Sequence, residues 1–105
     1  MASRVTIRRM LTARRISHKG LKLLYAKGDR SKINPKWVEK VERILNALSI
    51  ACAPSEMDFQ GFGYHELKRD RKGTHAVWIT RNQRVTFMWD SDGPYDVDLE
   101  DYHGR

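Results

Sequence analysis

The spacing of apolar residues changes near residue 59, and this change limits the folds that the chain can adopt. Before it, apolar side chains recur with the period of 3.6 that marks one face of a helix. Beyond it, they alternate with other residues, as they do along a strand. Helices followed by hairpin-connected strands predict an α+β fold, in which two N-terminal helices pack on an antiparallel-rich sheet.

Two helices are predicted before the change of period. The first spans about residues 18–27, and Gly28 is placed to end it. Its apolar face is formed by Leu21, Leu24 and Tyr25. The second begins at Asn34-Pro35, because asparagine caps helices well and proline is favoured at the first helical position. We expect it to end near residue 50, with an apolar stripe formed by Trp37, Val41, Ile44, Leu45 and Leu48.

Short alternating runs predict the strands of the sheet. We expect strands at residues 64–67, 74–79, 84–89 and 95–99. Asp92-Gly93-Pro94 supplies a turn before the last of them. Residues 11–16 are predicted to form an additional first strand. Trp78 and Trp89 are expected to pack in or beside the core, because tryptophan side chains bury a large apolar area.

Size and charge describe one basic domain. The chain has 105 residues and a formal net charge of +7, which fits a single domain over residues 11–105. Residues 1–89 carry 19 basic and 7 acidic side chains, whereas residues 90–105 carry 1 and 6. We expect residues 1–10 to be a flexible basic arm, and Met10 is an alternative start. This charge favours polyanionic partners, although many unrelated nucleic-acid-binding proteins share it.

Cysteine content and hydropathy bear on the compartment. Cys52 is the single cysteine, so no internal disulfide can form, and a reducing cytoplasm is expected. We interpret Cys52 as a small buried hydrophobic residue. No apolar run approaches the roughly 20 residues that a membrane helix needs. His18, His65, His75 and His103 lack the spacing of metal ligands, so no metal or other cofactor is expected.

Several side chains suited to cleaving RNA fall on or beside neighbouring predicted strands. Attack by the RNA 2'-hydroxyl needs a base, cations that stabilise the phosphorane, and an acid for the leaving oxygen. Histidine suits either proton transfer, and arginine and lysine suit the charge. The candidates are His65 and Lys68 in and after one strand, Arg84 in another, and Asp101, Tyr102 and His103 after the last.

These segments, taken in order, resemble the HigB-type toxins of bacterial toxin-antitoxin systems. Such toxins belong to the RelE/ParE superfamily and are also described as plasmid maintenance killer proteins. The resemblance runs from about residue 18 to residue 103. Its segments are His18-Lys19-Gly20-Leu21, Ile33-Asn34-Pro35, His65-Glu66-Leu67-Lys68, Asp70-Arg71-Lys72-Gly73, Arg84-Val85-Thr86-Phe87 and Asp96-Val97-Asp98-Leu99-Glu100-Asp101-Tyr102-His103.

The resemblance implies a microbial RNase-like fold and a ribosome-dependent endoribonuclease that cleaves mRNA in the ribosomal A site. It also implies neutralisation by a HigA-like helix-turn-helix antitoxin. At matching positions, the functional residues would be His65, Lys68, Arg84, Asp101, Tyr102 and His103. His65 and His103 would transfer protons, Lys68 and Arg84 would stabilise the phosphate, Tyr102 would stack on or orient a nucleotide, and Asp101 would orient a neighbour.

Other interpretations of the same residues stay open at this point. The sequence does not assign base and acid between the two histidines, and Arg84 has Asp96 and Asp98 as alternative ion-pair partners. A ParE-like toxin that binds DNA gyrase would need no nuclease site. A non-catalytic RNA or ribosome binder would use the basic groups and the tryptophans as a stacking surface.

Overall fold

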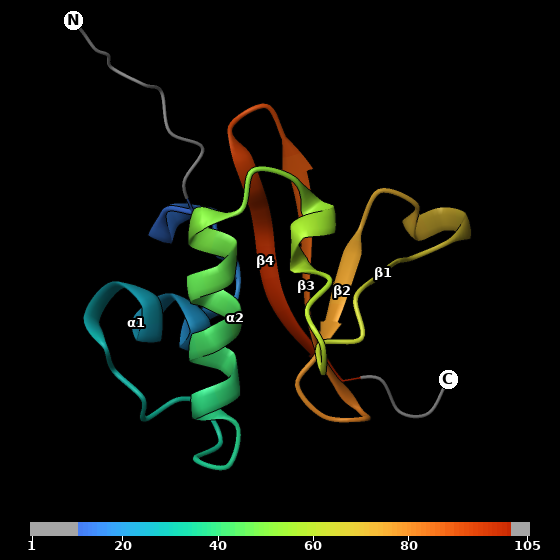
Figure 1. The fold of residues 1–105 in the computed structure, drawn as a ribbon. Coiled ribbons are helices and arrows are strands. Elements are labelled where there is room, and N and C mark those ends of the chain that lie inside the picture. The colour runs from blue at the N-terminus through green and yellow to red at the C-terminus, as the bar shows by residue number, and fades with distance from the viewer. Residues whose placement is uncertain (1–10, 102–105) are drawn as a thin grey trace, which may run out of the picture.

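A computed structural model describes residues 11–101, which form two helices packed on a four-stranded sheet (Figure 1). The helices are α1 (Lys19–Lys27) and α2 (Val38–Ile50). The strands are β1 (His65–Glu66), β2 (His75–Trp78), β3 (Gln83–Asp90) and β4 (Gly93–Asp101), antiparallel and in the order β1-β2-β3-β4. The predicted α+β fold is confirmed. The basic arm predicted at residues 1–10 lies outside the described residues.

Helix α1 begins and ends as its sequence predicts. The Nδ1 atom of His18 accepts a hydrogen bond from the backbone N–H of Leu21 at 3.1 Å and so caps the N-terminus. Gly28 ends the helix with a φ of 69°, a left-handed conformation that glycine adopts without a Cβ clash. Leu21 and Leu24 are buried in the core.

Helix α2 begins at Val38, three residues later than Pro35. Asn34 forms a turn instead, because its side-chain oxygen accepts from the N–H of Lys36 at 2.9 Å and its carbonyl from that of Trp37 at 2.8 Å. The helix ends at Ile50 as predicted. Its buried face is formed by Val38, Val41, Ile44, Leu45 and Leu48.

The prediction of a strand at residues 11–16 is wrong. Residues Ala13–Arg15 form one 3-10 turn, and Ile16 makes only an isolated parallel bridge to Val97 of β4. The backbone N–H groups of Ser17 and His18 both donate to the Val97 carbonyl, at 2.8 and 3.3 Å. Leu11 and Ile16 are buried, and Arg15 donates to Asp90 of β3 and to the carbonyls of Gly93 and Pro94 in β4. This segment is therefore held by its apolar side chains and by polar contacts with β3 and β4.

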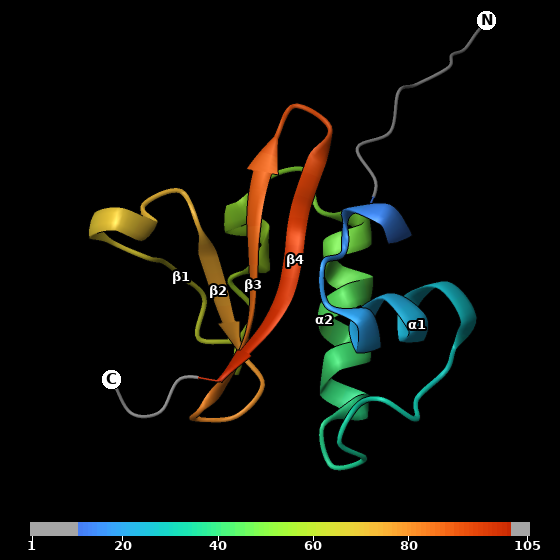
Figure 2. The ribbon, with the colours of Figure 1, turned by 180° about the vertical axis from the view of Figure 1, so that it is seen from behind.

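The sheet has one face toward the helices and one face away from them (Figures 1 and 2). Val77, Val85, Phe87 and Val97 are fully buried in the core that the helices share. Residues directly opposite one another on paired strands lie on the same face. The register therefore places two rows on the other side, here called the outer face. The first row is His65, Ala76, Thr86 and Asp98, and the second is Trp78, Arg84 and Glu100.

Two predictions about burial need correction. Cys52 is exposed, because it lies in the bend after α2, where its backbone N–H donates to Glu56 at 2.8 Å. Trp78 is 40% exposed on the outer face, whereas Trp89 packs against the core as expected. Among residues 11–101, no helix is long and apolar enough to cross a membrane.

Candidate functional site

The second row of the outer face holds Arg84 in a fixed position. Its guanidinium lies 5.0 Å from the centre of the Trp78 ring, within range of a cation–π contact. The same group donates to the carbonyls of Thr80 and Arg81 in the turn between β2 and β3. Arg84 is thus held by the turn and by an aromatic ring.

Gly63 makes room for Trp78. Its φ is +59°, and an added Cβ would lie 2.9 Å from the Trp78 Cδ2 atom. The indole ring therefore rests directly on the backbone at residue 63, while Arg84 stacks on the ring. A residue other than glycine at this position would push the ring, and with it the guanidinium, out of place.

His65 lies in the first row, on the edge strand β1, and its side chain is exposed. Its Nδ1 atom is 3.1 Å from the carbonyl oxygen of Gly63. A carbonyl oxygen can only accept, so Nδ1 carries the hydrogen of this bond. In the neutral ring the other nitrogen, Nε2, then holds the lone pair, which is what a general base needs.

Lys68 lies in the connection between β1 and β2. It is exposed and precedes a 3-10 turn at Arg69–Arg71. The pairing of Leu67 with Thr74 shows that the chain leaves β1 away from the Trp78 end of the sheet. Lys68 lines a shallow depression of about 350 Å³ together with Glu66, Leu67, Arg69 and Lys72. The residues that line this depression, three of them basic, are here called the rim of the outer face.

Glu100 and Arg71 complete the outer face, and sequence reasoning missed both. The Arg71 guanidinium donates to both carboxylate oxygens of Glu100, at 2.8 and 2.7 Å, and the Thr86 hydroxyl donates to the same carboxylate at 2.7 Å. The hydrogen bonds from Arg71 hold the pKa of Glu100 below its ordinary value, against the opposing effect of burial. Alternation along β4 was a usable signal for Glu100. Arg71 was hidden in a charged run that resembles a solvated turn.

Asp101 ends β4 near the same end of the sheet as Arg84. The Gln83 side-chain amide donates to its carboxylate at 3.2 Å. The register pairs Asp101 with Gln83, one residue along from the Arg84–Glu100 pair. Tyr102 and His103, the other two predicted residues of this segment, lie outside the described residues. The register thus places His65 and Arg84 on the outer face and Asp101 in the adjacent row of the opposite face, and Lys68 lies at the rim.

The two other described histidines have structural environments. His75 stacks between Tyr64 and Phe87 on the helix-facing side, and its Nδ1 lies 3.0 Å from the Tyr64 hydroxyl. Burial lowers the pKa of His75, so its ring stays neutral more readily. His18 caps α1. Within residues 11–101, no group of three or more His, Cys, Asp and Glu side chains is placed to hold a metal ion.

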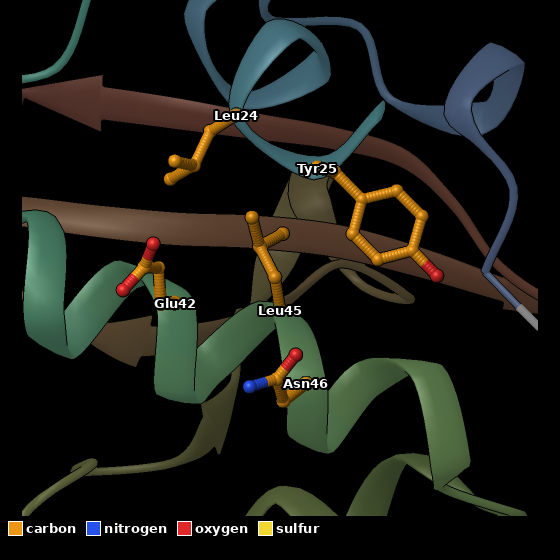
Figure 3. Close-up of a pocket in the computed structure, with 5 residues that line it drawn as sticks. All are labelled: Leu24, Tyr25, Glu42, Leu45 and Asn46. Carbon is orange, nitrogen blue, oxygen red and sulfur yellow. The ribbon is translucent and has the colours of Figure 1, made fainter. Parts of the chain in front are cut away.

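A hollow of about 360 Å³ between the helices is separate from these residues (Figure 3). Leu24 and Tyr25 of α1 and Glu42, Leu45 and Asn46 of α2 line it. The Tyr25 hydroxyl donates to the Leu11 carbonyl at 2.8 Å, and burial raises the pKa of Tyr25. The tyrosine thus ties α1 to the segment before it, and we assign the hollow to helix packing.

Comparisons with known proteins agree with this fold and with the resemblance inferred from the sequence. A family model described as the RelE-like toxin of type II toxin-antitoxin system HigB matches residues 14–103. This defines the class: a RelE-like α+β toxin. Endoribonuclease HigB from Proteus vulgaris is 36% identical over 86 residues, which cover 82% of this chain and 94% of that protein. The chain belongs to the HigB-like family of toxins of type II toxin-antitoxin systems, and an antitoxin is therefore its partner.

Proposed function

We propose that this toxin is an endoribonuclease that cleaves mRNA in the ribosomal A site and so inhibits translation. The observation that carries the proposal is the placement, on one face of the sheet, of an imidazole at His65 whose Nε2 can act as a base and a guanidinium at Arg84 that its contacts hold in place. The name of the Proteus vulgaris relative supports nuclease activity. The basic surplus of residues 1–89 supports binding to ribosomal RNA.

The roles follow from the chemistry of each group. Nε2 of His65 would remove the proton of the 2'-hydroxyl, which then attacks the adjacent phosphorus. His103 would protonate the leaving 5'-oxygen, so that no proton or charge is left unbalanced. Arg84 and Lys68 would stabilise the charge of the pentavalent phosphate. Tyr102 would stack on or orient a nucleotide, and Asp101 would orient a neighbouring cation or ring.

The test is cleavage of a defined mRNA bound to purified ribosomes. We expect products with a 2',3'-cyclic phosphate or 3'-phosphate and a 5'-hydroxyl. His65→Ala and His103→Ala should each lower the rate by about 10²- to 10⁴-fold, as is typical for a lost proton-transfer group. Lys22→Ala, which changes an exposed residue of α1, is the control. Wild-type rates in both histidine variants would refute the roles.

The proposed reaction uses no metal ion, and this step has its own test. Cleavage should continue when a chelator is added to ribosome–mRNA complexes that have been cross-linked to keep them intact. A rate that falls with chelator and returns with one particular divalent cation would contradict the proposal. The same assay with free mRNA should give little product, because the A site holds the mRNA in an attackable conformation.

The partners proposed beyond this site are a HigA-like helix-turn-helix antitoxin and the ribosome, in the cytoplasm. The antitoxin would act by covering the basic face or by making the toxin too bulky for the A site. Native mass spectrometry of the chain co-expressed with the antitoxin gene should show a stable complex that no longer cleaves mRNA.

One observation favours a second candidate. Trp78 is 40% exposed, and an exposed ring beside cations is typical of surfaces that stack RNA bases without cleaving them. Such a binder would protect ribosome-bound mRNA without shortening it. The cleavage assay therefore separates the two functions by the length of the recovered RNA.

A further inference from the structure

The ion pair between Arg71 and Glu100 links distant parts of the chain across the outer face. Arg71 follows β1 at one edge of the sheet, and Glu100 lies on β4 at the other, 29 residues further along. The two terminal guanidinium nitrogens, Nη1 and Nη2, each donate to a carboxylate oxygen, at 2.8 and 2.7 Å. Such a two-point contact fixes the plane of the guanidinium as well as its distance.

The environment of this pair is more organised than that of an ordinary surface ion pair. The Glu100 side chain is 25% exposed, and Thr86, which donates to it, is buried. One carboxylate oxygen thus receives both Thr86 and Arg71, each at 2.7 Å. By contrast, Lys68 and Lys72 line the exposed depression at the rim. Arg71 is the cation of this run that the fold directs across the sheet.

The Arg71 guanidinium is bound to the outer face, on which the two predicted catalytic groups His65 and Arg84 also lie. Glu100 is directly opposite Arg84, and Thr86 lies in the same row as His65. Neighbouring rows on one face are about 7 Å apart, and neighbouring strands about 5 Å. A phosphodiester bound beside Arg84 on this face would therefore lie within reach of the guanidinium that Glu100 holds.

We propose that Arg71 binds the phosphate of the RNA at this site, and that Glu100 is a positioning residue that holds the guanidinium in place. The inference rests on the proposed function and adds an RNA-binding residue to it. A guanidinium has five N–H donors, so one group can be anchored by a carboxylate and donate to a phosphate at the same time. Lysine at this position would carry the charge without the planar fork.

The first experiment measures kcat and KM on ribosome-bound mRNA. Arg71→Ala should lower kcat/KM by about 10- to 100-fold, the usual effect of losing a hydrogen bond to a charged group. Arg71→Lys should recover only part of this loss. Glu100→Gln keeps the size of the side chain but loses its charge, so it should lower kcat more than it raises KM. Lys22→Ala removes the same charge from α1 and should behave as the wild type.

The second experiment separates phosphate binding from a structural role. A single-stranded oligoribonucleotide with 2'-O-methyl groups cannot be cleaved, and its affinity is measured at several salt concentrations. Arg71→Ala should reduce the slope of log K against log salt by about 0.7, as expected for one lost contact to a single-strand phosphate. Lys22→Ala should leave the slope unchanged.

The outcomes distinguish the two proposals. If the wild type does not cleave mRNA on ribosomes, the proposed function fails. If the wild type cleaves and Arg71→Ala matches it in kcat/KM and in salt slope, the role of Arg71 is refuted. An Arg71→Ala variant that loses activity and thermal stability while keeping the wild-type salt slope would also refute it, because the ion pair would then be structural only.

Discussion

Two glycines with positive φ separate backbone strain from side-chain contact. Gly61 has a φ of +90°, and a Cβ added there would have no atom within 4 Å. Gly63 has a φ of +59°, and a Cβ added there would lie 2.9 Å from the Trp78 Cδ2 atom. Gly61→Ala should lower the free energy of unfolding by about 1–2 kcal/mol, the cost of a left-handed alanine. Gly63→Ala should lose about 1–3 kcal/mol more from overpacking. Urea unfolding followed by circular dichroism measures both.

The same pair of variants tests how Trp78 supports the site. If the ring holds Arg84 in place, Gly63→Ala should reduce mRNA cleavage and Gly61→Ala should not, when both are assayed at a temperature where each is folded. Equal stability losses in the two variants would mean that Trp78 does not press against residue 63.

His75 should make stability depend on pH near neutrality. Burial lowers its pKa in the folded protein below the ordinary 6.5, so between the two values the unfolded chain binds more protons. The free energy of unfolding should therefore fall as the pH is lowered through about 6.5. His75→Phe keeps the stacking on Phe87 and should flatten this dependence between pH 7.5 and 5.5. An unchanged slope would show that His75 is not its source.

Single residues were predictable where a strand pattern fixed their direction. Alternation along the strand predicts that Arg84 points to the other face from the buried Val85 and Phe87. The structure confirms that it lies on the outer face. The contact between Arg71 and Glu100 depends on how a turn folds over the sheet, which no local pattern contains. The prediction that Cys52 is buried was wrong. It rested on the average burial of cysteine, whereas a backbone bend after α2 exposes this one.

Helix α2 should be the element on which the fold depends most. Ile44 lies in its buried stripe with 0% exposure, whereas Ile50, at its C-terminal end, is 71% exposed. Ile44→Ala should lower the free energy of unfolding by about 2–5 kcal/mol through lost burial and an unfilled cavity. Ile50→Ala makes the same chemical change at the surface and should stay within about 0.5 kcal/mol. Equal losses would contradict the burial that the structure gives.

At the level of elements, period was a better guide than capping residues. The 3.6-residue stripe placed α2 and its end correctly, because burial on one face requires that spacing. The predicted start of α2 was wrong, because Asn34 accepts hydrogen bonds from Lys36 and Trp37 in a turn and does not cap the helix. The prediction of a strand at residues 11–16 was wrong, because the apolar residues of this segment fill the core beside a 3-10 turn and do not pair as a strand.

Over the whole molecule, the acidic end serves as an attachment site for distant basic and polar segments. Asp90 pairs with Arg15 at 3.0 Å, Asp96 accepts from Ser17, and Glu100 pairs with Arg71. The hydrogen bond from Arg15 also holds the pKa of Asp90 below its ordinary value. Acids that the sequence shows as a separate block are therefore partly neutralised within the fold, whereas Lys68, Arg69 and Lys72 line the depression beside the outer face.

Whether the cations at this rim contact ribosomal RNA can be tested by charge reversal at matched sites. Lys68 and Lys72 lie at the rim of the outer face, and Lys22 and Lys36 are exposed in α1 and just before α2. Lys68→Glu with Lys72→Glu should weaken binding to ribosomes strongly and flatten its dependence on salt, because phosphate contacts are lost. Lys22→Glu with Lys36→Glu changes the net charge equally and should have the smaller effect. Sedimentation with purified ribosomes at 50 to about 200 mM salt, a range over which such contacts weaken steeply, makes the comparison. Equal weakening by both pairs would mean that overall charge, and not the outer face of the sheet, determines binding.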